Sequence, residues 1–150
     1  MFCLTPHCWR TGVDDDSKHP QHFRNGFDVA ETTLATLKRI GVDYEVIACD
    51  PDYADTRGFC EQYGYPLPHF TNVIVAAGNT ETRCYAAYVL LATTRLDVNH
   101  SVRKRLGTSR TSFAFADEAR PLAGMEISDI TPFGLPESLP LWFDQHVMVS

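Results

Sequence analysis

The sequence predicts an α+β fold, a single domain in which helices flank a mixed β-sheet. Amphipathic helical patterns and β-rich runs interleave along the chain, without the regular strand-helix-strand rhythm of an all-parallel sheet. With 150 residues, 44% of them hydrophobic and 21% charged, the chain is long enough to bury one sizeable core. No internal repeat or low-complexity segment indicates a second unit.

The first 26 residues differ from the rest in composition. They mix Cys, His, Trp and Pro with an acidic run, and show neither the period of a helix nor that of a strand. We therefore expect an irregular tail over 1–26 and a folded domain over 27–150. Zinc is the alternative for the tail, because thiolates and imidazoles suit its tetrahedral site. The candidate ligands are Cys3, Cys8, His19 and His22. Their spacing matches zinc motifs poorly, so we expect no metal and no cofactor.

Two helices and one strand are expected in the next part of the chain. Asp28 followed by Glu31 resembles a capping box, and a single apolar face then extends to Gly41. That face comprises Ala30, Leu34, Leu37 and Ile40. Residues 44–49 (YEVIAC) are rich in β-formers and predict a short strand. A second helix is expected from Asp55 to Tyr63.

The middle of the sequence predicts a hairpin. Residues 70–77 (FTNVIVAA) and 83–94 (RCYAAYVLLATT) are β-rich runs joined by a short polar loop. Asn99 is then expected to cap a helix whose Val102 and Leu106 face inward and which ends at Gly107. Further strand candidates are 112–115, 141–144 and 146–149, and the Gly/Pro-rich stretch 124–140 reads as a structured loop.

Composition also limits the function. The net charge of −6 argues against general nucleic-acid affinity, and we expect no binding to DNA. Residues 95–110 nevertheless contain five basic residues and one acid, a net of +4, so the remainder carries −10. No apolar stretch is long enough to span a bilayer, and the start does not resemble a secretory signal. Together with an odd number of cysteines, five, these features predict a cytoplasmic protein that is not bound to membranes.

Three segments carry a family resemblance. They are TTRLDVNHSVRKRLG at 93–107, GMEISDITPFGLP at 124–136 and LPLWFD ending at Asp144. Their content, order and spacing resemble the YbaK-like and prolyl-tRNA-synthetase-associated editing domains, over most of the chain beyond the tail. The resemblance implies a curved mixed sheet and hydrolysis of the ester that joins a wrong amino acid to tRNA. Its implied partner is aminoacyl-tRNA, with an aminoacyl-tRNA synthetase as a further candidate.

The resemblance also implies a set of site residues. Family members line the substrate pocket with a Gly-Gly-X-(Ser/Thr)-Pro-X-Gly loop, whose backbone N–H groups would stabilise the oxyanion. The implied catalytic positions are Thr71, Asn72, Ser128, Asp129 and Gly134. Substrate binding is implied for Gly124, Thr131, Pro132 and Asp144. The exposed basic residues Arg103, Lys104 and Arg105 are the candidates for tRNA contact, although such a face can also simply be solvated.

Several of these positions depart from the family pattern. Many members carry a lysine where Thr71 stands, and glycines where Ser128 and Asp129 stand. Asp129 places a carboxylate near the implied oxyanion site, which opposes catalysis. Members also continue beyond the last strand, so a chain stopping at Ser150 reads as truncated or naturally shortened. The sequence therefore leaves three hypotheses: an aminoacyl-tRNA deacylase, a catalytically degenerate relative that binds tRNA acceptor ends or a protein partner, or a poorly folding fragment of a once-active enzyme.

Overall fold

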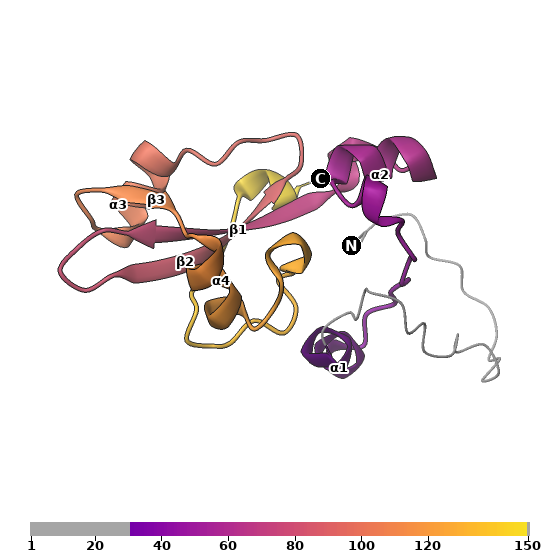
Figure 1. Cartoon of the computed structure of the whole chain (residues 1–150), viewed down its shortest axis with the longest axis horizontal. Helices are drawn as coiled ribbons and strands as arrows, with labels where there is room; N and C mark the ends of the chain where they lie inside the picture. Colours follow the sequence, from indigo (N-terminus) through magenta and orange to yellow (C-terminus); the bar gives the residue numbers. More distant parts are fainter. Residues whose placement is uncertain (1–30, 150) are drawn as a thin grey trace.

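The fold is built on one four-stranded sheet. The computed structural model of the chain describes residues 31–149, without the side chain of Ser128. The strand order is β3-β1-β2-β4, and helices lie against both faces of the sheet (Figure 1). The α+β class predicted from the sequence is confirmed.

A long hairpin forms the centre of the sheet. β1 (Thr71–Gly78) pairs antiparallel with β2 (Cys84–Leu91) over the full length of both strands, from Thr71↔Leu91 to Gly78↔Cys84. Most of β2 and the second half of β1 are buried. The predicted hairpin is therefore present: its first strand is shifted by one residue from 70–77, and its second strand is shorter than the expected 83–94.

Two short strands flank the hairpin. β3 (Thr111–Phe113) runs antiparallel to β1 and pairs only with its last three residues, Ala76–Gly78. β4 (Leu141–Phe143) runs parallel to β2 and pairs with Ala87–Val89. The parallel β4 makes the sheet mixed, as predicted.

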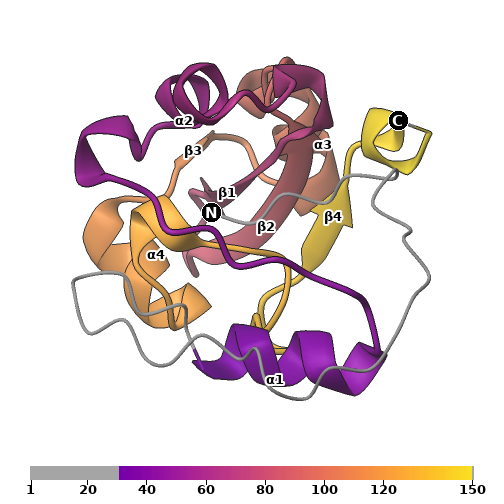
Figure 2. The same cartoon turned by 90° about the vertical axis from the view of Figure 1, so that its right-hand side faces the viewer.

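The two sheet faces bury different helices. Even-numbered strand residues such as Ala76 and Tyr88 pack against Val102 and against Leu106 of α3 (Arg103–Leu106). On the other face, Tyr85 of β2 contacts Glu118 of α4 (Ala116–Ala123). Figure 2 shows α3 and α4 on either side of the β1–β2 hairpin.

Two further helices complete the fold. α1 (Glu31–Ile40) buries Thr33 and Leu37, whereas Ile40, expected on the same apolar face, is exposed. α2 (Thr56–Tyr63) begins after Asp55 as predicted and buries Phe59 and Cys60. An extended segment joins the two helices and runs past the sheet (Figure 2). Within residues 31–149, no helix is long and apolar enough to cross a membrane.

Three local predictions were wrong. Residues 44–49 form no strand and pair with none; Ile47 and Cys49 instead pack against the Phe59 cluster. Residues 146–149 are not a strand either, since Asp144 caps a one-turn 3₁₀ helix, Gln145–Met148. The cap of the basic helical segment is Asp97, whose carboxylate accepts the His100 N–H, and not Asn99.

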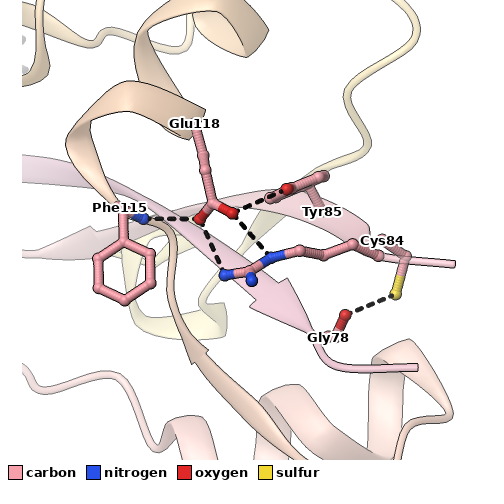
Figure 3. Close-up of polar contacts among 6 residues, drawn as sticks. Gly78, Cys84, Tyr85, Phe115 and Glu118 are labelled. Carbon is pink, nitrogen blue, oxygen red and sulfur yellow. Dashed lines mark hydrogen bonds and ion pairs between the residues drawn. The ribbon is translucent and has the colours of Figure 1, made fainter. Parts of the chain in front are cut away.

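The sequence reading also missed α4. The interior Pro121 hides this helix, because proline lacks a backbone donor and usually ends a helix. Its first turn is held by Glu118, whose carboxylate accepts from the Phe115 N–H, the Tyr85 hydroxyl and the Arg83 guanidinium at 2.9–3.2 Å (Figure 3). Charge-assisted hydrogen bonds of this kind are stronger than neutral ones. Glu118 thus ties α4 to the start of β2.

Replacing Glu118 tests this contact. We expect Glu118→Ala to lower the free energy of unfolding by about 1–3 kcal/mol, since several donors lose a charged acceptor. Urea unfolding followed by circular dichroism measures the change. Glu137→Ala removes an exposed carboxylate from the loop and is the control, with an expected change within about 0.5 kcal/mol. Equal effects of the two substitutions would contradict the assigned role of Glu118.

Candidate functional site

A cavity of about 530 Å³ lies at the start of β1. Three segments line it: the first half of β1, the beginning of α2 and the loop that follows α4. The lining residues are Ala54, Asp55, Thr56, Thr71, Asn72, Val73, Ile74, Ile127, Asp129, Ile130, Thr131, Pro132 and Phe133. A concave site with apolar walls and a few polar groups is the usual form of a small-molecule pocket.

The beginning of α2 fixes a polar group on β1. Asp55 caps the helix by accepting the N–H groups of Arg57 and Gly58, both at 3.0 Å. The next residue, Thr56, donates its hydroxyl to the side-chain oxygen of Asn72 at 3.0 Å. This hydrogen bond orients the Asn72 amide and leaves its nitrogen as a donor without a partner among the described residues.

The loop wall is held by its own turn and by α1. The Thr131 hydroxyl donates to the Phe133 carbonyl at 3.0 Å and accepts the Phe133 N–H at 3.2 Å. The same carbonyl accepts the Thr33 hydroxyl of α1 at 3.1 Å. Gly134 follows with φ +86°, and a Cβ there would lie 2.8 Å from the backbone of Thr32. Glycine is therefore required where the loop touches α1.

The charge of the lining is one-sided. It contains the carboxylates of Asp55 and Asp129 but no Lys, Arg or His. The Asp55 carboxylate is already used by the α2 cap, whereas the exposed Asp129 carboxylate has no partner in the described part of the chain. Such a site disfavours extra negative charge and favours a cationic ligand group.

The structure brings together five of the residues implied by the family resemblance. Thr71, Asn72, Asp129, Thr131 and Pro132 all line the cavity. The backbone of Ser128 lies in the adjoining 3₁₀ turn, Ile127–Asp129.

The other implied residues lie outside the cavity lining. Gly124 ends α4 with φ +67°, and Gly134 packs on α1. Asp144 lies at the end of β4, two strands away from β1. Arg103, Lys104 and Arg105 are exposed on α3, whose core residues pack on the sheet face opposite α4.

The lining also contains eight residues that the sequence did not predict as site residues: Ala54, Asp55, Thr56, Val73, Ile74, Ile127, Ile130 and Phe133. Asp55 carried a signal, but only that of a helix cap. Val73 and Ile74 read as ordinary strand residues, and nothing local marks them as part of a site. Among residues 31–149, no group of three His, Cys, Asp or Glu side chains could hold a metal ion, and the Cys/His tail lies outside the described residues.

Asp144 has a local structural role. Its carboxylate accepts the backbone N–H of His146 at 2.8 Å and contacts the His146 imidazole at 2.6 Å. The backbone N–H is the main reason why the pKa of Asp144 lies below its ordinary value of 3.8; the imidazole adds to this and partial burial opposes it. A lowered folded-state pKa stabilises the fold above the ordinary value, and this contribution is lost as the pH falls through the folded-state pKa.

A carboxyl titration by NMR tests this assignment. We expect the Asp144 midpoint below 3.8 in the wild type. In His146→Ala the midpoint should rise but stay below 3.8, because the backbone donor remains. A return to the ordinary value in His146→Ala would show that the imidazole, not the backbone, controls the carboxyl group.

Comparisons with solved structures support the fold. The hypothetical protein APE2540 is 20% identical, with a TM-score of 0.68 over 80% of this chain and 77% of its own. A protein proposed as a trans-editing enzyme for prolyl-tRNA synthetase is 17% identical, with a TM-score of 0.68 over 84% of this chain and 78% of its own. At these identities the likeness shows a shared fold.

The sequence comparison identifies the family. No curated protein matches the sequence. A family model, however, the aminoacyl-tRNA editing domain, matches residues 50–150, which include α2, all four strands of the described sheet and the whole cavity lining. The chain therefore belongs to the aminoacyl-tRNA editing domain family.

Proposed function

We propose that the protein is an aminoacyl-tRNA deacylase that hydrolyses the ester of mischarged tRNA in trans. One observation carries the proposal: within the family-matched region, the Thr131–Pro132 loop and Asn72 meet around a single cavity. Its apolar walls suit an amino-acid side chain, and its polar groups suit the ester. The structural neighbour proposed to edit for prolyl-tRNA synthetase supports the same activity class.

The proposed chemistry needs few protein groups. A water molecule attacks the ester carbonyl carbon, and the carbonyl oxygen becomes an oxyanion. The Asn72 amide nitrogen and N–H groups of the loop at 128–134 donate hydrogen bonds to that oxyanion. The bond from the carbonyl carbon to the ribose oxygen then breaks, the ribose oxygen takes up a proton and the free amino acid leaves. The proton lost by the attacking water balances the one gained by the leaving ribose oxygen, and the resemblance implies that a neighbouring ribose hydroxyl of the substrate assists the attack.

The proposed partner is aminoacyl-tRNA. Because the cavity holds only the aminoacyl end, recognition of the tRNA body requires another surface. Arg103, Lys104 and Arg105 are exposed cations that could contact phosphates. An aminoacyl-tRNA synthetase, which releases the mischarged tRNA, is the proposed protein partner.

Deacylation of a panel of mischarged tRNAs by the purified protein tests the activity. We expect at least one ester to be hydrolysed faster than in buffer. Asn72→Ala should lower kcat/KM on that substrate by roughly tenfold or more, because it removes an oxyanion donor. Asn99→Ala is the matched control, since Asn99 is exposed and lies outside the cavity lining. Hydrolysis of none of the esters would exclude the deacylase.

A second function is favoured by the charge of the cavity. Its lining lacks any cation, and Asp129 adds a carboxylate at the loop. Both features weaken oxyanion stabilisation. The alternative is therefore a degenerate editing domain that binds tRNA acceptor ends, or a protein partner, without hydrolysis.

A salt titration of tRNA binding separates these cases. For either tRNA-binding function, replacing Arg103, Lys104 and Arg105 together by Ala should reduce the slope of log affinity against log salt by roughly 2–3. Binding by the wild type without deacylation would support the degenerate domain. No binding of tRNA would point to a protein partner, and an unchanged slope would remove α3 from the tRNA contact.

A further inference from the structure

β1 is paired unequally on its two sides. Toward β2 it is paired from Thr71 to Gly78. Toward β3 it is paired only over Ala76–Gly78, and one more hydrogen bond joins the Ala114 N–H to the Val75 carbonyl at 2.9 Å. Within residues 31–149, the stretch 71–74 therefore has no strand neighbour on the β3 side (Figure 1).

The direction of the free main-chain groups follows from the register. In an antiparallel pair, alternate residues direct both their N–H and C=O toward the same neighbour. The Ala92 N–H donates to the Phe70 carbonyl at 2.7 Å, which assigns even-numbered residues to the β2 side. On the other side, the Ala114 N–H donates to the Val75 carbonyl, and the Asn79 N–H donates to the Arg110 carbonyl. These two hydrogen bonds assign odd-numbered residues to the β3 side.

Thr71 and Val73 accordingly direct their N–H and C=O groups toward the unpaired side. Both residues line the cavity. No described residue hydrogen-bonds these main-chain groups. The cavity thus presents a short β-strand edge, with donors and acceptors in fixed alternation.

A single amino-acid residue fits such an edge. The α-amino nitrogen and carbonyl oxygen of an aminoacyl group are spaced like the N–H and C=O of a strand residue. We propose that the aminoacyl group adds to β1 as a one-residue antiparallel strand opposite Val73. The Val73 N–H donates to the ester carbonyl, and the substrate ammonium donates to the Val73 carbonyl. This inference rests on the proposed function and describes how that site recognises its substrate.

The charges around the edge agree with this placement. The substrate ammonium is cationic, and the lining offers it the carboxylate of Asp129 and no competing cation. The Asp129 carboxylate repels an oxyanion but attracts the ammonium at the other end of the same aminoacyl group. The two ends of the ligand then lie beside different groups: the ammonium near Asp129, and the carbonyl on the Val73 N–H.

The same placement makes Val73 a specificity residue. Side chains of paired residues lie on the same face of a sheet, about 5 Å apart at Cβ. The substrate side chain would therefore lie beside the Val73 side chain. A ligand without an α-amino group would lose one of the two hydrogen bonds.

Binding of non-hydrolysable amides tests the proposal. The probes are 3′-(L-alanyl)amino-3′-deoxyadenosine and its 3′-propionyl counterpart, which lacks only the α-amino group. Alanine has the smallest chiral side chain and so avoids any dependence on pocket size. By calorimetry we expect the alanyl probe to bind the full chain about tenfold more tightly.

Two substitutions of Val73 test the contribution of its main-chain N–H separately from that of its side chain. Val73→Pro removes the free N–H without breaking a sheet hydrogen bond, and proline is tolerated at such edges. It should weaken both probes about fivefold or more, whereas Val73→Ala keeps the N–H and should preserve the preference for the alanyl probe. If Val73→Pro does not fold, NMR of the wild type replaces it: saturation with the alanyl probe should slow hydrogen exchange at the Val73 amide.

Several results would overturn the inference. They are equal binding of the two probes, absence of binding at millimolar concentration, and an unperturbed Val73 amide in the saturated protein. Pairing of the edge with a second copy of the chain would also overturn it; Val73→Pro would then change the sedimentation mass of the protein and not its affinity for the probes. The deacylation panel is independent, because amino-dependent binding without hydrolysis would leave this inference standing and remove the deacylase.

Discussion

The unequal pairing of β1 is the constraint on which the site depends. On one side, β1 pairs with β2 along its whole length. On the other side, β1 pairs with β3 only over the last residues of β1. If β3 were longer, it would occupy the space where the cavity lies. The shortness of one edge strand thus creates both the concavity and the main-chain groups that face it.

Each wall of that concavity is fixed by a small number of hydrogen bonds. α2 contributes Thr56, which orients Asn72, while Asp55 completes the helix start beside it. The opposite wall is a turn closed by Thr131 on Phe133. The polar groups are therefore set before any ligand arrives, which reduces the reorganisation needed for binding.

The parts of the fold that were predicted are those with local causes. The hairpin, the start of α2 at Asp55 and the short β4 all follow from β-propensity, capping or turn chemistry. The errors arose where tertiary contacts decided the outcome. YEVIAC has the composition of a strand but packs Ile47 and Cys49 against the Phe59 cluster, and α4 forms despite Pro121 because Glu118 holds its first turn. The family resemblance pointed to Asn72 and Thr131, and both line the cavity. No pattern could have located the free edge at Val73, since it depends on where β3 ends.

The contact between α1 and the loop has a kinetic consequence. The hydrogen bond from Thr33 to Phe133 spans 100 residues, whereas the hairpin that carries the opposite wall closes over only a few. Contacts of such separation form late, because the intervening chain must first lose its freedom. We expect the hairpin and α2 to be ordered while the loop is still open, so that the pocket is the last part of the molecule to assemble. Local unfolding should begin with the part that forms last: the loop separates from α1 while the sheet stays intact.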